Sequence, residues 1–466
     1  MNIKYKEIVA WVRHQLDAKQ LKVGDKLPSI RSLAQQFQCS KNTVSKALAE
    51  LEKLHIVYAK PKSGYYVVDF FQTDRPAQDE VDFLSAGPDQ RIMPYEDFQH
   101  CMNQAIEHYK EELFTYSDRQ GLFSLRVELT KYLQHLQVFT IPERLVITSG
   151  SQQALQILAV MPFPNGKTHV LIEDPTYFGM LETLKLNHVP TIGLPLSMEG
   201  IDFEQLEHLF RTKKIKFFYV IPRCHNPLGH HYSNSEKRKI VELAEKYDIY
   251  IVEDDFLAEL DTDTKADPLF TYEPNGRVIY LKSFSKVFLP GLRIATVVLP
   301  ENMIVRFIQH KFSADFNTSA LSQGALEIYL KNGMFRYHLE KVQQLYTKKM
   351  QLLLEACERY LPDDIQYSKP NNGFYMTINI PSPVDAKQLI EQLKEKHIFV
   401  DHATEMYWAK PRPQAIRLSI SQVDEAFICD GIQEIASQIQ LLKTIQFNPL
   451  SFRFFNRTEH TPKKSK

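Results

Sequence analysis

The spacing of hydrophobic positions at the start of the chain is helical. Apolar residues recur at helical intervals between Tyr5 and Ala18, and two further runs, each preceded by a serine suited to cap a helix (Ser29 and Ser40), show the same spacing. The inward face of the last run is formed by Val44, Leu48, Leu51 and Leu54. Two short β-rich stretches, "IVYAK" and "YYVV", follow on either side of a turn containing Gly64. Three short helices and a hairpin predict a winged helix-turn-helix over residues 1–70.

From residue 81 the pattern changes to strand-like runs that alternate with helical runs. "RLVITSG" leads into "SQQALQILAVM", and "IKFFYVIP" leads through a loop into "SNSEKRKIVELAEKYD". This alternation predicts an α/β fold with a mostly parallel sheet and helices on both faces, in which ligands bind at the carboxyl ends of the strands. After about residue 360 shorter strands predict a small C-terminal α+β subdomain. We therefore expect a linker at 71–80, a large domain at 81–445, and a partly disordered tail at 446–466.

Charge divides the chain in the same place. The whole chain of 466 residues has a formal net charge of zero, but residues 1–70 contain twelve Lys and Arg against six Asp and Glu. A basic module on an acidic body indicates a polyanionic partner for the first seventy residues only. The five cysteines are scattered without metal-binding spacing, no apolar run is long enough to span a membrane, and the N-terminus lacks a secretory core. These features predict a cytoplasmic protein without a metal site.

Candidate chemistry lies where the strands of the large domain end. "TSGSQQAL" offers small residues and free backbone N–H groups at a helix start, which suit an anion. Tyr177 and Asn226 follow two other strands, and Asp254 and Asp255 end a buried one. Lys286 lies in the otherwise apolar run "SFSKVFLPGLRIA". Each signal alone has an ordinary explanation, such as a helix cap, a turn residue or a core tyrosine.

The N-terminal stretch "GDKLPSIRSLAQQFQCSKNTVSKALAELEKLHIVYAKPKSGYYV" resembles the GntR-type DNA-binding domain over nearly its full length. The resemblance implies binding to a double-stranded DNA operator. The residues that it implies on the DNA side are Arg31, Ser40, Asn42, Thr43 and Lys46, and we expect Lys62 at the wing tip to contact the backbone. The chain departs from the family in having lysine at positions 41 and 46, where arginine is common.

Residues from about 80 to 440 resemble the fold-type I pyridoxal-phosphate enzymes of the aspartate aminotransferase kind. The order of anion loop, aromatic, Asn-Pro, Asp, Ser-x-Ser-Lys and Arg carries the resemblance. It implies that Lys286 forms an internal aldimine with pyridoxal 5′-phosphate, Tyr177 stacks on the ring, Asp254 pairs with the ring nitrogen and Asn226 bonds the 3′-oxygen. The implied phosphate ligands are Ser149, Gly150, Ser151, Gln152, Ser283, Ser285 and Arg293. Arg417, in "IRLSIS", is implied to bind the carboxylate of an amino acid.

Together the two resemblances give the layout of the MocR/GabR family of bacterial regulators. This implies a PLP-dependent transcriptional regulator that senses an amino acid, an amine or PLP itself. It also implies a homodimer in which the winged helix crosses to the partner. The alternatives are a working aminotransferase, with full, weak or half transamination and an accessory DNA-binding head, and a DNA-binding protein with an inert aminotransferase relic. Phe256 stands where relatives have a tyrosine, which weighs against efficient transamination, and Ala295 stands where a glycine is common. The effector, the operator and the direction of regulation stay open.

Overall fold

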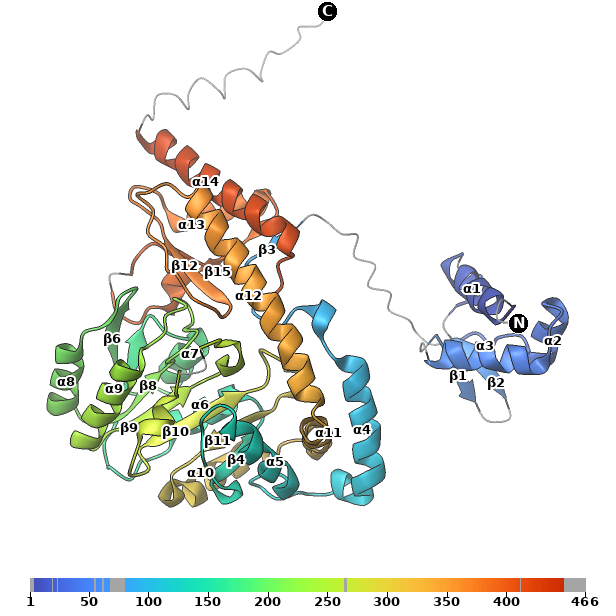
Figure 1. Cartoon of the computed structure of the whole chain (residues 1–466), viewed down its shortest axis with the longest axis horizontal. Coiled ribbons are helices and arrows are strands. Elements are labelled where there is room, and N and C mark those ends of the chain that lie inside the picture. Colours follow the sequence, from blue (N-terminus) through green and yellow to red (C-terminus); the bar gives the residue numbers. More distant parts are fainter. Residues whose placement is uncertain are drawn as a thin grey trace, which may run out of the picture. The chain divides into compact units, whose positions relative to one another are not determined.

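The computed structural model describes residues 4–18, 20–22, 24–53, 56–60, 63–67, 80–263, 266–410 and 412–447. The chain forms two compact units, residues 1–78 and 79–466, which are treated separately below (Figure 1). Most of the expected linker and the tail from residue 448 on lie outside the described residues. The last helix continues to Phe447, two positions beyond the expected end of the large domain.

The N-terminal unit has three helices and a hairpin. They are α1 (Lys4–Asp17), α2 (Ile30–Gln36), α3 (Lys41–Lys53), β1 (Val57–Lys60) and β2 (Gly64–Val67), and the two strands pair antiparallel. Ser29 begins α2, where its hydroxyl accepts a hydrogen bond from the Ser32 N–H at 3.1 Å. The side chains of Ile8, Leu33, Val44 and Leu48 are fully buried and form the core between the helices. Leu54, expected on the inward face, lies outside the described residues.

An eight-stranded sheet forms the centre of the larger unit. Its strand order is β4-β11-β10-β9-β8-β5-β6-β7. The strands are β4 (Leu145–Thr148), β5 (His169–Asp174), β6 (Thr191–Ser197), β7 (Gly200–Ile201), β8 (Ile215–Val220), β9 (Tyr250–Asp254), β10 (Val278–Ser283) and β11 (Ala295–Val298). All run parallel except β11 and β7, which are antiparallel to their neighbours. The central strands β5, β8 and β9 are almost wholly buried, as expected for a sheet covered by helices.

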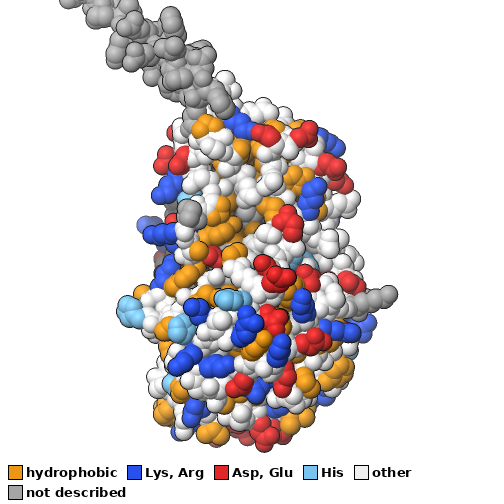
Figure 2. Space-filling view, turned by 90° about the vertical axis from the view of Figure 1, so that its left-hand side faces the viewer, with side chains coloured by type: hydrophobic (Ala, Val, Ile, Leu, Met, Phe, Trp, Pro, Cys, Tyr) orange, Lys and Arg blue, Asp and Glu red, His pale blue; other side chains and the backbone are white. Residues whose placement is uncertain are grey.

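Helices and short 3₁₀ turns connect these strands. The helices are α4 (Tyr95–Tyr109), α5 (Phe123–Gln134), α6 (Ser151–Val160), α7 (Phe178–Leu186), α8 (Phe203–Thr212), α9 (Asn234–Lys246), α10 (Glu301–Asp315), α11 (Ala320–Lys331) and α12 (Met334–Tyr360). The 3₁₀ turns are η1 (Gln90–Ile92), η2 (Lys110–Phe114), η3 (Pro142–Arg144), η4 (Ala258–Leu260), η5 (Leu269–Tyr272), η6 (Pro290–Leu292) and η7 (Ala403–Met406). On the face shown in Figure 2, charged side chains of both signs are interspersed.

The long helix α12 leads into a smaller C-terminal part. It contains the antiparallel sheet β12-β15-β14, formed by Tyr375–Asn379, Ala415–Ser419 and Asp401–His402, together with helices α13 (Ala386–Glu395) and α14 (Glu425–Phe447). The strand β3 (Val81–Asp82) pairs in parallel with β13 (Ile398–Phe399). The chain that leaves the N-terminal unit therefore joins the C-terminal part first and enters the large sheet only afterwards.

Two negative findings apply to the described part of the chain. It contains no helix that is long and apolar enough to cross a bilayer. It also contains no group of three or more His, Cys, Asp or Glu side chains placed to hold a metal ion.

Candidate functional site

The carboxyl ends of the parallel strands open into a cavity of about 320 Å³. The cavity collects residues that lie far apart in the sequence. Of the residues predicted to bind a cofactor, those that line it are Ser151, Gln152, Tyr177, Asn226, Asp254, Ser283, Ser285, Lys286 and Arg293. Ala86, Gly87, Phe256 and Pro290 complete the lining.

Asp254, the last residue of β9, is buried at the floor of this cavity. Its Oδ2 accepts a hydrogen bond from the Tyr219 hydroxyl at 2.7 Å, while its Oδ1 has no hydrogen-bond partner among the described residues. Burial raises the pKa of Asp254 to about 7, because a charged carboxylate is poorly solvated there. This carboxyl group is therefore suited to a ligand that brings a hydrogen-bond donor or a positive charge.

The neighbouring Asp255 has a different environment. It is also fully buried, but it accepts hydrogen bonds from Arg223 Nε at 2.7 Å and from the Tyr280 hydroxyl at 2.7 Å. Burial alone would raise the pKa of Asp255, but the Arg223 guanidinium outweighs burial and holds it below its ordinary value. Adjacent carboxylates thus have opposite pKa shifts, and only Asp254 is open to a ligand.

Lys286 enters the cavity from the loop after β10. Its Nζ donates a hydrogen bond to the carbonyl oxygen of Ala86 at 2.7 Å. Ser283 ends β10 and Ser285 lies in this loop, and the Ser285 N–H donates a hydrogen bond to the Ser283 hydroxyl at 3.3 Å. A primary amine and small hydroxyls therefore meet at one wall.

The start of α6 and Arg293 form the anion end of the cavity. Gly150 has φ +82°, and a Cβ there would lie 2.4 Å from Arg293 Nη2, so only glycine lets the guanidinium approach. Arg293 itself has a left-handed backbone with φ 54°. Ser149 and Gly150 do not line the cavity, and the Ser149 hydroxyl donates to Asp315 Oδ2 at 2.7 Å instead.

Tyr177 and Gln152 lie close to the backbone at the start of α7. A Cβ at Gly179 would come within 2.6 Å of the Tyr177 ring and within 2.5 Å of Gln152 Oε1, so this glycine makes room for both. Gln152 Nε2 donates to the Gly179 carbonyl at 2.9 Å. Burial raises the pKa of Tyr177 to about 12, so the ring is a neutral phenol. Phe256 lines the same cavity without a hydroxyl group.

Arg417, on β15, lies beside the cavity and is already paired. Its Nη1 donates to Asn226 Oδ1 at 3.2 Å, and its Nη2 donates to the Leu84 carbonyl at 3.1 Å. Its Nη2 also lies 2.7 Å from Asp401 Oδ2. Asp401 stands directly opposite Arg417 in the β14–β15 ladder, so the register of the sheet sets this ion pair. Arg417 Nε is buried and has no hydrogen-bond partner among the described residues.

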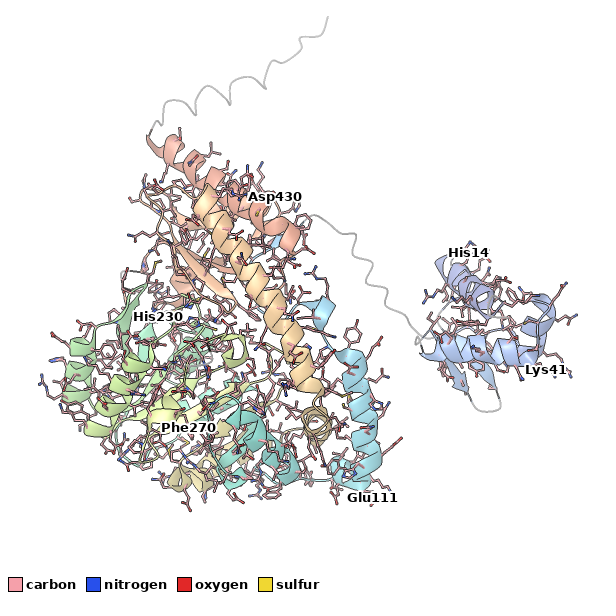
Figure 3. All side chains as sticks on the ribbon, in the orientation of Figure 1. His14, Lys41, Glu111, His230, Phe270 and Asp430 are labelled. Atoms are coloured by element: carbon pink, nitrogen blue, oxygen red, sulfur yellow. The ribbon has the colours of Figure 1, made fainter. Side chains whose placement is uncertain are left out.

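In the N-terminal unit the predicted DNA-binding side chains are mostly exposed. Arg31, Asn42 and Lys46 are accessible, and Lys41 lies at the outer end of α3 (Figure 3). The hydroxyls of Ser40 and Thr43 are 2.9 Å apart, and the Ser40 hydroxyl also accepts the Thr43 N–H, so both take part in capping α3. Lys62, the remaining residue predicted to contact DNA, lies outside the described residues.

Comparison with known proteins identifies both units. Residues 4–67 match the family model described as bacterial regulatory proteins of the gntR family, and residues 90–435 match the model described as aminotransferase class I and II. The chain is 40% identical to the HTH-type transcriptional regulator YcxD of Bacillus subtilis, over 94% of this chain and 100% of that protein. The chain belongs to the MocR/GabR-like family of GntR-type regulators.

Solved structures are similar to the larger unit of this MocR/GabR-like chain. The kynurenine aminotransferase of Pyrococcus horikoshii is 28% identical with a TM-score of 0.73, and the alignment covers 78% of this chain and 92% of that chain. LysN, an α-aminoadipate aminotransferase of Thermus thermophilus complexed with N-(5′-phosphopyridoxyl)-L-leucine, is 26% identical with a TM-score of 0.72, covering 79% and 94%. These similarities confirm the predicted fold class. Pyridoxal 5′-phosphate is the cofactor of this domain.

The residues present in the cavity fit that cofactor. Asp254 Oδ1 is a buried acceptor without a partner among the described residues, which suits a protonated ring nitrogen. Arg293 and the glycine at position 150 leave room for an anion beside the start of α6. Lys286 supplies the primary amine.

Four residues that shape the site were not found from the sequence. Tyr219 bonds Asp254, Arg223 neutralises Asp255, Ala86 accepts the Lys286 amine, and Asp401 pairs with Arg417. In the sequence, Tyr219 could have been noticed as a hydroxyl-bearing residue inside the apolar strand "IKFFYV". For Asp401 the signal would have been strand pairing, which a single sequence does not display.

Proposed function

We propose that this chain is a transcriptional regulator whose PLP-binding domain senses a small molecule through an aldimine at Lys286, and whose N-terminal unit binds an operator. The observation that carries the proposal is one cavity that joins Lys286, the unpaired oxygen of Asp254 and Arg293, in a chain that begins with a GntR-type unit. Candidate effectors are an amino acid, an amine or PLP itself.

Each residue of the cavity has a role in this proposal. Lys286 holds the cofactor covalently, Asp254 keeps a proton on the ring nitrogen, and Tyr177 covers one face of the ring. Asn226 holds the 3′-oxygen. The phosphate is held by Ser149, Gly150, Ser151, Gln152, Ser283, Ser285 and Arg293. Bound pyridoxal phosphate supplies an aldehyde carbon that captures primary amines. Ser149 must turn away from Asp315 to contribute its hydroxyl.

Arg417 is proposed to hold the carboxylate of an amino acid effector, and Asp401 limits this role. A guanidinium binds a carboxylate bidentately, but Asp401 already occupies Nη2. A carboxylate-bearing effector must therefore displace Asp401 or share the guanidinium with it. An amine without a carboxylate has no such competitor.

The segment 83–86 supports a route from the cavity to the N-terminal unit. Three successive carbonyl groups in it accept side-chain hydrogen bonds: Leu84 from Arg417 at 3.1 Å, Ser85 from the Ser421 hydroxyl at 2.7 Å, and Ala86 from Lys286 at 2.7 Å. A cofactor bound to the Lys286 amine competes with the hydrogen bond to Ala86. An effector bound to Arg417 competes with the hydrogen bond to Leu84. Effector binding can change DNA affinity only if it favours one arrangement of the chain, and this segment supplies such a difference.

The operator is contacted in this proposal by Arg31, Ser40, Asn42, Thr43, Lys46 and Lys62. Exposed polar side chains at the start of α3 suit base edges in the major groove, and the lysines neutralise phosphates. The regulator acts as a homodimer, with N-terminal units exchanged between protomers.

The decisive experiment reduces the PLP-saturated protein with borohydride and maps the labelled peptide. Lys286 should carry the label, and Lys286→Ala should carry none, whereas Lys331→Ala, at an exposed site on α11, should label normally. A label on another lysine would overturn the assignment. A gel-shift assay on the upstream region of the gene, with and without PLP and candidate amines, tests regulation.

The alternative function is an aminotransferase with an accessory DNA-binding unit. The acidic pair Asp254 and Asp255, together with Lys286 and Arg417, is compatible with it, whereas Phe256 places no hydroxyl in the cavity. A steady-state assay with amino donors and 2-oxo acids separates the two functions. Phe256→Tyr should increase half-transamination and leave cofactor binding nearly unchanged.

A further inference from the structure

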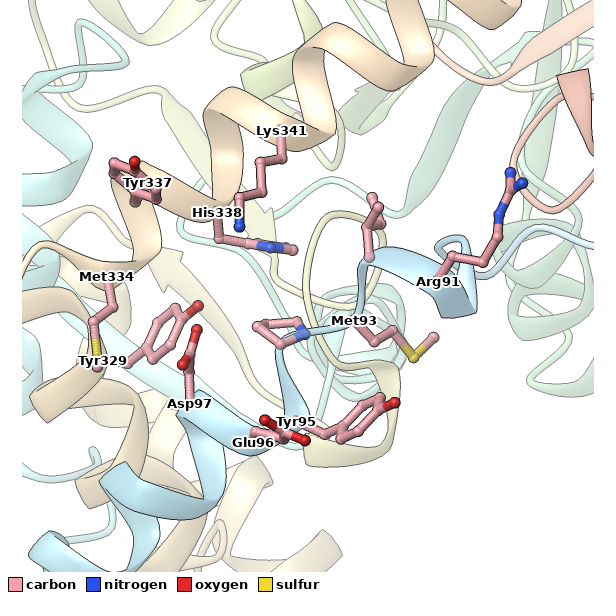
Figure 4. A pocket seen from close by; sticks show the side chains of 12 residues that line it. Arg91, Met93, Tyr95, Glu96, Asp97, Tyr329, Met334, Tyr337, His338 and Lys341 are labelled. Atoms are coloured by element: carbon pink, nitrogen blue, oxygen red, sulfur yellow. The ribbon is translucent and has the colours of Figure 1, made fainter. Parts of the chain in front are cut away.

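A second cavity, of about 440 Å³, lies between the start of α4, the end of α11 and the start of α12 (Figure 4). Pockets for small organic ligands typically measure about 300–1,000 Å³, so this cavity is large enough for one. None of the residues assigned above to the cofactor or to DNA lines it.

Charges of opposite sign face each other across this cavity. Lys341 extends from α12 beside His338, and Asp97, in the first turn of α4, lies on the opposite wall next to Tyr329 (Figure 4). Both charges act on the His338 imidazole, whose pKa is lowered mainly by burial, then lowered further by Lys341 and raised by Asp97. Glu96, Asp97 and Lys341 are exposed and form no ion pair with any residue that the structure describes. Lys341 Nζ lies 5.6 Å from the centroid of the Tyr337 ring. The other cation of the lining, Arg91, is already paired with Asp89 and Asp424.

Tyr329 supplies a buried polar group in the same wall. Its side chain is almost fully buried, and it lines the cavity. Burial raises the pKa of Tyr329 well above its ordinary value, and the nearby Asp97 adds to this shift. A phenol that lines the cavity offers a hydrogen-bonding group to a ligand bound there.

We propose that this cavity is a second ligand site, which binds a free amino acid as a zwitterion. The ammonium group pairs with Asp97 and the hydroxyl of Tyr329, and the carboxylate pairs with Lys341. The ring of Tyr337 and the side chains of Met93 and Met334 provide apolar surface for the amino acid side chain. A zwitterion offers a partner to Asp97 and to Lys341 at once, whereas a simple amine or a simple carboxylate offers a partner to only one of these two side chains.

The cavity is connected to the lysine that binds the cofactor. His338 Nε2 donates a hydrogen bond to the carbonyl of Val287 at 2.8 Å, and Val287 directly follows Lys286 in the chain. The rings of Tyr329 and His338 also pack against Phe288, with centroids 4.8 and 5.8 Å away. An amino acid that moves either wall residue therefore acts on the loop that carries Lys286. This site lies away from the cofactor cavity and goes beyond the proposed sensing by Lys286.

The test uses full-length holoprotein reduced with borohydride, so that amino acids can no longer react at the cofactor. Calorimetric titration with each of the common L-amino acids should find at least one that binds saturably. Its decarboxylated amine and its deaminated acid should bind about tenfold more weakly or worse, because each loses one charge-assisted contact. Absence of saturable binding by any amino acid at millimolar concentration would overturn the proposal.

Matched variants locate the site. Asp97→Asn and Lys341→Gln should each weaken binding about tenfold, and Tyr329→Phe should weaken it a few-fold, as expected for one lost hydrogen bond. Glu107→Gln, an exposed change on the same helix outside the cavity, should have no effect. Unchanged affinity in Asp97→Asn would place the ligand elsewhere and overturn the assignment. Thermal unfolding of each variant verifies that it is folded.

The link to Lys286 has its own readout. The reduced pyridoxyl group is fluorescent, and its emission should change when the amino acid binds. Binding without any such change would refute the connection through His338. Failure of the proposed cofactor function would show instead as an absence of borohydride labelling, which is a separate observation.

Discussion

The lysines of the two units are used in opposite ways. Lys41 and Lys46 on α3 are exposed, and Lys46 only covers the ring of Tyr5, at 4.9 Å from its centroid. In the larger unit Lys282 and Lys349 are wholly buried and pair with Glu259 at 2.5 Å and Asp89 at 2.8 Å. Exposed charges remain available to a polyanion and add little to stability, whereas loss of one partner of a buried ion pair leaves an uncompensated charge and is strongly destabilising. The contrast separates exposed lysines, which we expect to contact DNA, from buried lysines that pair with carboxylates.

Among the changes that test this contrast, replacement of Arg223 should have the largest effect on stability. Arg223→Ala leaves Asp255 as an uncompensated buried charge, so the free energy of unfolding should fall by about 3–5 kcal/mol, as measured by urea denaturation. Arg211→Ala, on the exposed side of α8, should change it by less than about 0.5 kcal/mol. Equal effects of the two variants would break the distinction between buried and exposed charges.

The next effect is a dependence of stability on pH that originates at Asp254. Its pKa is about 7 in the folded protein and about 3.9 when unfolded, so the folded state binds more protons between these values. The free energy of unfolding of the cofactor-free protein should therefore fall as pH rises from about 4 to about 7, by up to about 1.4 kcal/mol per pH unit.

Asp254→Asn should remove this contribution. The comparison is the difference between the two proteins across the pH series, because Glu253 also has a pKa raised to about 7 by burial and remains in the variant. Parallel curves for the variant and the native protein would show that Asp254 is ionised in the folded state.

A smaller effect is expected at Asp401. Asp401→Asn frees the Arg417 guanidinium, so the affinity for a carboxylate-bearing effector should rise about tenfold, by one charge-assisted bond. The affinity for its decarboxylated amine should not change. Titrations followed by cofactor absorbance measure both, with the exposed Asp363→Asn as the control. An equal change for the two ligands would indicate that Asp401 acts on the structure and not on ligand choice.

The smallest effect concerns the exposed charge of Lys46. Lys46→Ala should leave the unfolding free energy within about 0.5 kcal/mol of the native value. It should reduce the slope of log affinity against log salt concentration by about 1, as measured by anisotropy with operator DNA. Lys331→Ala, in the other unit, should leave the slope unchanged. An unaltered slope for Lys46→Ala would remove this lysine from the DNA interface.

Local patterns were enough to predict the elements of the fold. Helical spacing and capping serines located α2 and α3, and the alternation of strands and helices predicted the mostly parallel sheet. Because parallel strands end at one edge, the positions after them also predicted that Tyr177, Asn226, Asp254 and Lys286 would share a cavity.

Contacts between distant residues were not predictable in this way. The Ser149 hydroxyl donates a hydrogen bond to Asp315 on α10, and Arg417 forms an ion pair with Asp401 on the neighbouring strand. From the sequence alone, many polar residues could have been the partner of Ser149 or of Arg417, because only the tertiary fold brings Asp315 and Asp401 close to them. The carbonyl of Ala86 as partner of Lys286 depends in the same way on where the N-terminal segment of the large unit lies.

The pairing of β3 with β13 fixes the point, here called the anchor, at which the chain from the N-terminal unit joins the larger unit. Residues 68–80 separate the last strand of the N-terminal unit from this anchor, and such a length of chain can span at most about 45 Å. One turn of DNA measures about 34 Å, which is shorter than the maximum span of this length of chain. The anchor belongs to the C-terminal part and not to the large sheet. Any displacement of that part therefore also displaces the point at which the chain from the N-terminal unit joins the larger unit.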